Sequence, residues 1–213
     1  MIKNVIFDID GTLWDSTEVA ALGWRKAAEE TGYSKVVVTG EILKKEFGLP
    51  MNIIADHVFY DLKDEEKKAE LLALCCKYED EFLEESYDEK IFPGIIEEIK
   101  KLAKDYRLFI VSNCQIGYIE LVMGRLGITE LIEDHLCFGE THVTKGETMK
   151  ILMDKNGLDP KQTAYVGDTA GDKEATEFAG AVFVYAAYGF GQLPDEPYAA
   201  ESPNLIGEIL HSI

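Results

Sequence analysis

Short apolar runs alternate with amphipathic segments along most of the chain. Four runs fit buried parallel strands, in which nearly every side chain is apolar: residues 4–9, 107–112, 163–168 and 181–185. A weaker run covers 136–139. Segments with helical spacing lie among them, at 93–105, 117–127, 145–157 and 172–180. This alternation predicts a doubly wound α/β sheet.

The stretch between the first two strands has a different pattern. Residues 17–89 show helical periods and no good strand, so we predict an inserted helical domain over 17–87, with 1–16 and 88–213 forming the α/β core. Thr39 precedes a helical pattern and is predicted to cap that helix. The last helix of the insert carries apolar side chains on one face: Leu71, Leu74, Cys75, Tyr78 and Phe82.

Charge and composition narrow the range of partners. The 213 residues carry a formal net charge of −19, from 40 acidic and 21 basic side chains. A nucleic acid would be repelled, and a small anionic substrate would need cations within its own site. No apolar run is long enough to predict a membrane span, and no secretion signal is apparent. The four cysteines lack metal-site spacing, so we expect reduced thiols in a cytoplasmic protein.

Polar side chains follow three of the predicted strands at the point where each strand ends. The run at 4–9 leads into DIDGT, the run at 107–112 into VSN, and the run at 163–168 into VGDTAGD. Because the carboxyl ends of parallel strands meet at one edge of a sheet, we expect these side chains to lie together. They are Asp8, Asp10, Ser112, Asn113, Asp168 and Asp172.

Carboxylates crowded at one edge require a cation. Two unit charges 4 Å apart repel by about 4 kcal/mol at an effective dielectric constant of about 20. Oxygen ligands without histidine or cysteine suit Mg²⁺, which keeps room for water and phosphate. Asp8 could then attack phosphorus and form an aspartyl-phosphate, while Asp10 manages the protons. Gly11 permits the sharp turn between the strand and the next segment.

These motifs resemble those of the haloacid dehalogenase superfamily. DIDGT matches its first motif, VSN the second, TKGET the third and VGDTAGD the fourth, over residues 4 to about 191. The resemblance is greatest to phosphatases of the phosphoglycolate phosphatase type. It implies a doubly wound, Rossmann-like core with an inserted α-helical cap domain. It also implies Mg²⁺-dependent hydrolysis of a small phosphate monoester, phosphoglycolate-like or a sugar phosphate, through an aspartyl-phosphate.

The resemblance assigns roles to the first three motifs. Asp8 would be the nucleophile and Asp10 the general acid and base. Ser112 would bind phosphate, with Asn113 beside it, and Lys145 would be the cation that steadies Asp8 and phosphate. The lysine is followed by glycine, where the family often has proline.

The fourth motif would complete the metal site. Asp168 would bind the metal beside Asp8 and the main-chain carbonyl of Asp10. Asp172 would act less directly, through water or through Lys145.

Two alternatives to a phosphatase stay open. A phosphosugar mutase of the superfamily usually carries a histidine about ten residues after the first motif, where this chain has Ala20 and Ala21. A regulator that only binds phosphorylated metabolites would be expected to lack Asp8 or Asp10.

Substrate choice is predicted to lie in the cap. We expect a small phosphorylated metabolite as the partner, no nucleic acid or membrane, and a monomer or homodimer. The candidate specificity residues are Trp14, Trp24, Arg25, Lys44, Lys45, Phe47 and Gly48.

Overall fold

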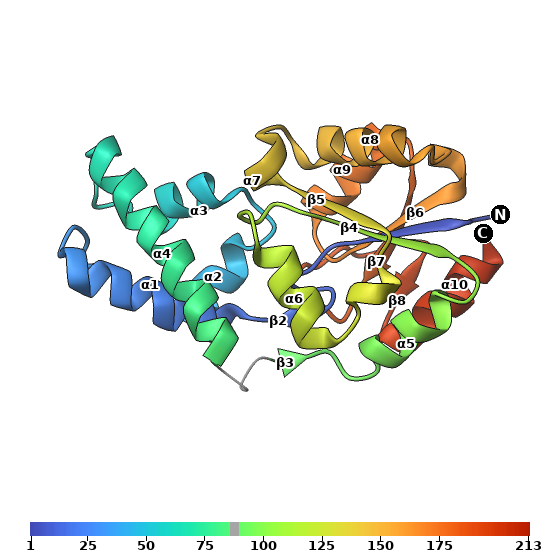
Figure 1. The fold of residues 1–213 in the computed structure, drawn as a ribbon, viewed down its shortest axis with the longest axis horizontal. Helices are drawn as coiled ribbons and strands as arrows, with labels where there is room; N and C mark the ends of the chain where they lie inside the picture. The colour runs from blue at the N-terminus through green and yellow to red at the C-terminus, as the bar shows by residue number, and fades with distance from the viewer. Residues whose placement is uncertain (86–89) are drawn as a thin grey trace. The chain divides into compact units, whose positions relative to one another are not determined.

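The computed structural model describes residues 1–85 and 90–213, which form two compact units (Figure 1). One unit comprises Met1–Trp14 and Ile91–Ile213, and the other comprises Asp15–Lys90. The short strands β2 (Trp14–Asp15) and β3 (Lys90–Ile91) pair where the chain passes between the units. The predicted boundary between residues 87 and 88 lies outside the described residues.

The first unit is built on a six-stranded sheet with the order β5-β4-β1-β6-β7-β8, and all its described pairings are parallel. From central β1 the chain first adds strands on one side and then returns to add strands on the other, as in doubly wound folds. The predicted α/β core is therefore confirmed. The strands are β1 (Asn4–Phe7), β4 (Arg107–Ser112), β5 (Asp134–Cys137), β6 (Thr163–Gly167), β7 (Val182–Ala186) and β8 (Ala199–Ala200).

Helices cover both faces of this sheet. In Figure 1, α8 (Lys145–Asn156) and α9 (Ala170–Ala179) lie above it, whereas α5 (Ile95–Leu102), α6 (Tyr118–Leu126) and α10 (Ile206–Ser212) lie below. Beneath α8, the buried side chains of Met149 and Leu152 pack with Phe109 and Tyr165 of the sheet. The short helices are α7 (Phe138–Thr141), η1 (Thr129–Leu131), η2 (Pro160–Gln162) and η3 (Pro203–Leu205).

Two predicted boundaries in this unit are wrong. The weak run at 136–139 lies too late in the chain, because the Glu133 amide already bonds to Leu108, strand β5 ends at Cys137, and helix α7 begins at Phe138. Residues 193–204 hold three of the six prolines, a composition that predicts a surface loop, yet the segment contains β8, whose two alanines add to the edge of the sheet. Both segments are short and carry little periodic signal.

The second unit is helical. It contains α1 (Thr17–Thr31), α2 (Gly40–Glu46), α3 (Met51–Val58) and α4 (Glu65–Glu85). The predicted cap at Thr39 is confirmed, since its side chain accepts a hydrogen bond from the Ile42 amide. Helices α1 and α4 pack so closely at Gly23 that a side chain there would collide with the backbone of α4.

The buried face of α4 differs from the predicted one. Leu71, Cys75 and Tyr78 are buried as expected, but Leu74 and Phe82 are only half-buried. Leu83 and the acidic Glu79 are buried instead. Glu79 is accommodated because the Trp24 indole donates a hydrogen bond to it over 2.7 Å. Among the described residues, no helix is long and apolar enough to cross a membrane.

Candidate active site

Strand β1 delivers Asp8 to the carboxyl edge of the sheet. The Asp8 amide bonds to the Val166 carbonyl of β6 over 2.9 Å, so the residue is held as an extension of the strand. The chain then turns sharply, with Gly11 at φ 85° and its amide bonded to the Trp14 carbonyl. A side chain at Gly11 would also collide with the Asp168 carboxylate. Glycine is required here by both the backbone angle and the space.

Lys145 is the buried cation of the site. It is the first residue of α8, whose N-terminus is fixed by the Thr144 capping box. Its ammonium lies 3.1 Å from Asp8 Oδ1 and 2.6 Å from Asp172 Oδ1. A lysine that is 6% exposed requires such partners, and here it joins two carboxylates that would otherwise repel each other.

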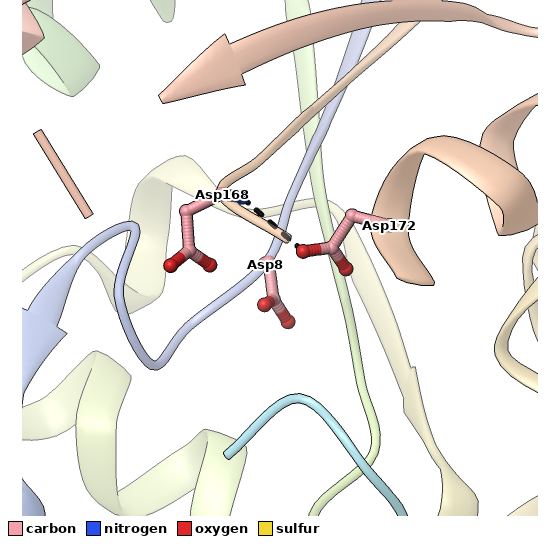
Figure 2. Close-up of side chains that lie close together, drawn as sticks. All are labelled: Asp8, Asp168 and Asp172. Atoms are coloured by element: carbon pink, nitrogen blue, oxygen red, sulfur yellow. Dashed lines mark hydrogen bonds between the residues drawn. The ribbon is translucent and has the colours of Figure 1, made fainter. Parts of the chain in front are cut away.

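Three carboxylates converge beside this lysine (Figure 2). Asp8, Asp168 and Asp172 are buried, and each offers an oxygen within 4.8 Å of the others. The Asp10 side chain is not part of this cluster, and the sequence had suggested only its main-chain carbonyl as a ligand. The structure therefore brings together residues from β1, α8 and the β6–α9 segment.

Asp172 uses both of its carboxylate oxygens within the protein. Oδ1 accepts from Lys145, and Oδ2 accepts from the Thr169 hydroxyl at 2.7 Å and the Thr169 amide at 2.9 Å. The Asp168 amide also reaches Oδ2, at 3.2 Å, which is the bond drawn in Figure 2. Asp172 is thus arranged to orient Lys145 and the turn that carries Asp168.

Only one of the two carboxylate oxygens of Asp168 accepts hydrogen bonds in the described structure. Its Oδ2 accepts main-chain hydrogen bonds from Phe190, at 2.6 Å, and Gly191, at 3.3 Å. Its Oδ1 is buried and has no hydrogen-bond partner in the described structure. An orphaned carboxylate oxygen inside an acidic cluster is costly unless a cation binds it. The donor set, with oxygen ligands alone, fits a hard divalent ion.

The pKa values of the cluster follow from burial and charge. Burial raises the pKa of Asp8 to about 7; the Lys145 ammonium lowers it, while the Asp172 and Asp10 carboxylates raise it. Burial, together with the charges of Asp172 and Asp8, raises the pKa of Asp168 well above its usual value. The protein alone therefore disfavours full ionisation of these two groups.

In Lys145 and Asp172, by contrast, the shifted pKa values favour the charged form. Burial opposes the charge of Lys145, but the carboxylates of Asp172 and Asp8 more than compensate and raise the pKa of this lysine. Burial likewise opposes the charge of Asp172, yet Lys145 and Thr169 lower its pKa. These two groups form a permanently charged pair at neutral pH.

The end of β4 provides hydroxyl and amide groups. Ser112 is the buried last residue of the strand, and half-buried Asn113 follows it. Strand β4 pairs with β1, so Ser112 and Asp8 lie at the carboxyl ends of neighbouring strands. The Ser112 hydroxyl also contacts the Cys114 thiol.

Asp10 has a partner that sequence reasoning missed. The Tyr118 hydroxyl donates a hydrogen bond to Asp10 Oδ1 over 2.8 Å, although 108 residues separate them. Two main-chain donors, Phe190 and Gly191, were also missed, although the glycine-rich YGFG segment marks where the chain approaches Asp168 closely. Side chains at Gly189 or Gly191 would collide with Asp168.

Two of the candidate specificity residues, Trp14 and Trp24, are completely buried. The Trp14 ring packs edge-on against Tyr118, and the Trp24 ring stacks on Phe59 within the helical unit. Both tryptophans therefore pack within the protein, and their contact with a substrate stays a prediction.

The other candidates lie within the helical unit. Arg25 donates to the Val38 carbonyl at 2.7 Å, and Lys44 pairs with Asp15 at 3.0 Å. Lys45 is exposed, Phe47 is buried and Gly48 turns the chain at φ 100°. Their contact with a substrate stays a prediction.

Comparison with known proteins agrees with this geometry. Residues 5–186 match the model of the haloacid dehalogenase-like hydrolase family. The phosphoglycolate phosphatase of Aliivibrio fischeri is 24% identical, covering 97% of this chain and 92% of its own. That of Aquifex aeolicus is 27% identical, with 91% of each chain covered.

Solved structures show the same fold. A predicted phosphoglycolate phosphatase from Haemophilus somnus superposes with a TM-score of 0.83 at 23% identity, over 98% of this chain and 97% of the other. A β-phosphoglucomutase from Clostridium difficile gives 0.79 at 19% identity, over 100% and 98%. The family model covers most of the chain, and the predicted hydrolase class is confirmed: this protein belongs to the haloacid dehalogenase-like hydrolase family.

Proposed function

We propose that this protein is a Mg²⁺-dependent phosphatase that hydrolyses a small phosphate monoester through an aspartyl-phosphate on Asp8. The observation that carries the proposal is the position of Asp8, at a strand end, 3.1 Å from a buried lysine and within 4.8 Å of Asp168. An anionic nucleophile beside a cation and a candidate metal ligand is what attack on a phosphate dianion requires. The phosphatase names of the curated relatives support the same reaction.

The first half of the proposed reaction uses both aspartates of DIDGT. An Asp8 oxygen attacks phosphorus, the bond from phosphorus to the leaving oxygen breaks, and Asp10 gives that oxygen a proton. Lys145 keeps its charge throughout, since its pKa is raised, and it orients Asp8 toward the phosphate. Ser112 and Asn113 donate hydrogen bonds to the other phosphate oxygens.

The second half regenerates Asp8. Asp10, now a carboxylate, takes a proton from water, which attacks phosphorus and releases inorganic phosphate. Asp8, Asp168 and the Asp10 carbonyl would hold Mg²⁺. When bound, the ion supplies positive charge that offsets the repulsion between the phosphate and the carboxylates.

We propose further that the helical unit acts as the cap that selects the substrate. The core groups address only the phosphoryl group, so discrimination among phosphoglycolate-like and sugar phosphates would rest on exposed polar residues of that unit, such as Lys45. The four free cysteines of the chain fit our expectation of a cytoplasmic enzyme, acting as a monomer or homodimer.

Turnover of p-nitrophenyl phosphate tests the reaction. We expect release of p-nitrophenol with Mg²⁺ and none after EDTA treatment, with activity restored when Mg²⁺ is returned. A panel of phosphorylated metabolites, analysed for phosphate release, then ranks substrates. Conversion of a sugar phosphate into its isomer without phosphate release would identify a mutase, and binding of metabolites without any turnover would identify a regulator.

Mg²⁺ should also stabilise the fold in a pH-dependent manner. The pKa values of Asp8 and Asp168 are raised above the unfolded value of 3.8. Without metal, the protonated forms of these two groups stabilise the fold below about pH 4. This contribution is lost as pH rises toward 7, because the groups must then ionise within the folded protein. A cation removes this penalty, so we expect saturating Mg²⁺ to raise the melting temperature by about 5–10 °C at pH 7.5.

Calorimetry at two pH values measures this effect. The increase should be smaller at pH 5.5, where protons compete with the metal. Asp168→Asn should abolish most of the increase, because it removes one charge and one ligand oxygen. An equal increase in wild type and variant would contradict the assignment of Asp168 as a ligand.

A further inference from the structure

A tyrosine lies against the carboxylate that would carry protons in the reaction. Tyr118 begins α6, directly after Gly117, whose φ of 91° turns the chain into the helix. Its hydroxyl donates to Asp10 Oδ1 over 2.8 Å. The side chain is buried, with 1% of its surface exposed, so water competes little for this bond.

The ring of Tyr118 is fixed as well as its hydroxyl. Trp14 packs edge-on against it, with ring centroids 6.1 Å apart and planes at 62°. Trp14 belongs to the same turn as Asp10, because the two residues form a β-bridge and the Gly11 amide bonds to the Trp14 carbonyl. The turn that carries Asp10 therefore also carries Trp14, whose ring packs against Tyr118, the residue that donates a hydrogen bond to Asp10.

We propose that Tyr118 is a positioning residue for Asp10, holding its carboxyl group in one orientation through the hydrogen bond to Oδ1. This inference rests on the proposed function. A carboxyl group that accepts at Oδ1 cannot rotate about its Cβ–Cγ bond without losing that hydrogen bond. Trp14 acts one step further away, by preventing the Tyr118 ring from tilting.

Dependence of the rate on the leaving group tests this role. A positioned general acid matters most when the departing oxygen is a strong base, and little when the departing phenolate is stable. Phenyl phosphate and p-nitrophenyl phosphate differ mainly in this property and are nearly matched in shape. The kcat/KM value reports only the steps up to phosphoryl transfer to Asp8, so slow hydrolysis of the aspartyl-phosphate does not mask the effect.

Tyr118→Phe removes the hydroxyl and keeps the ring against Trp14. We expect kcat/KM for phenyl phosphate to fall by about 10- to 100-fold, the loss of a hydrogen bond to a charged group, and that for p-nitrophenyl phosphate by less than about threefold. In Asp10→Asn, the losses of kcat/KM for the two substrates should differ by a larger factor. Adding Tyr118→Phe to Asp10→Asn should then change little, since the group to be positioned is already absent.

Tyr188→Phe is the matched control. It removes another tyrosine hydroxyl beside the same turn, one that donates to the Thr12 carbonyl at 3.0 Å, and it keeps the ring against Phe92. This control should lower kcat/KM for both substrates by the same factor, or leave both values unchanged. Equal losses for both substrates in Tyr118→Phe would overturn the positioning role and leave the phosphatase proposal intact. Absence of aryl phosphate turnover in the wild type would overturn the proposed function itself.

Discussion

Replacing Asp8 with asparagine should abolish turnover while leaving the protein folded. The amide keeps the size and an acceptor oxygen for Lys145, but it cannot form the acyl phosphate, so we expect kcat to fall by at least about 10⁴-fold. Stability should not fall in parallel. The pKa of Asp8 is raised to about 7, so at neutral pH the fold is destabilised by ionising this group. The metal-free variant should therefore melt no lower than the wild type at pH 7.5.

Rapid quenching with labelled substrate measures the intermediate directly. Wild-type protein should retain label that hydroxylamine releases, as expected of an acyl phosphate, and Asp8→Asn should retain none. Asp134→Asn is the matched control. Asp134 is the first residue of β5, so it lies at the amino ends of the strands, away from Asp8, and it pairs with Lys155. The control should keep near wild-type turnover. An Asp8→Asn variant with wild-type kcat would refute Asp8 as the nucleophile.

The convergence of Asp8 and Asp168 was predictable from the sequence for a physical reason, whereas Lys145 was expected only from the family resemblance. Buried parallel strands are nearly continuous apolar runs, so their ends are visible, and parallel topology then brings those ends to one edge. Register follows from the same pattern: Phe7 pairs with Ile110 and with Val166, which aligns the residues that come next.

Other parts of the site carry no comparable signal. Phe190 and Gly191 serve through main-chain amides, and any residue except proline has such a donor. Tyr118 is the first residue of a helix, and its sequence pattern indicates an ordinary core residue. Only the fold brings its hydroxyl to Asp10. The burial of Trp24 was also not predictable, because its hydrogen-bond partner Glu79 is 55 residues away.

The second large effect expected is that of Lys145→Met, which should reduce both activity and stability. The change leaves Asp8 and Asp172 buried without their cation, and breaking a buried pair on one side costs about 3–5 kcal/mol. For a chain of this size that corresponds to roughly 6–20 °C in melting temperature. Without the lysine the pKa values of both carboxyl groups rise, so the loss should be largest above neutral pH and should diminish as acid protonates them.

A second substitution separates charge pairing from chemistry. Lys145→Met combined with Asp172→Asn removes both members of the 2.6 Å pair, so metal-free stability at pH 8 should recover by more than half of the loss. Turnover should not recover, because the phosphate and Asp8 still lack their cation. Lys173→Met, which breaks a partly exposed pair with Glu196, is the control and should change stability by less than about 1 kcal/mol. If the double variant were as unstable as Lys145→Met, packing of the lysine stem rather than charge would account for the loss, and the buried ion pair would not be what holds Asp8 in place.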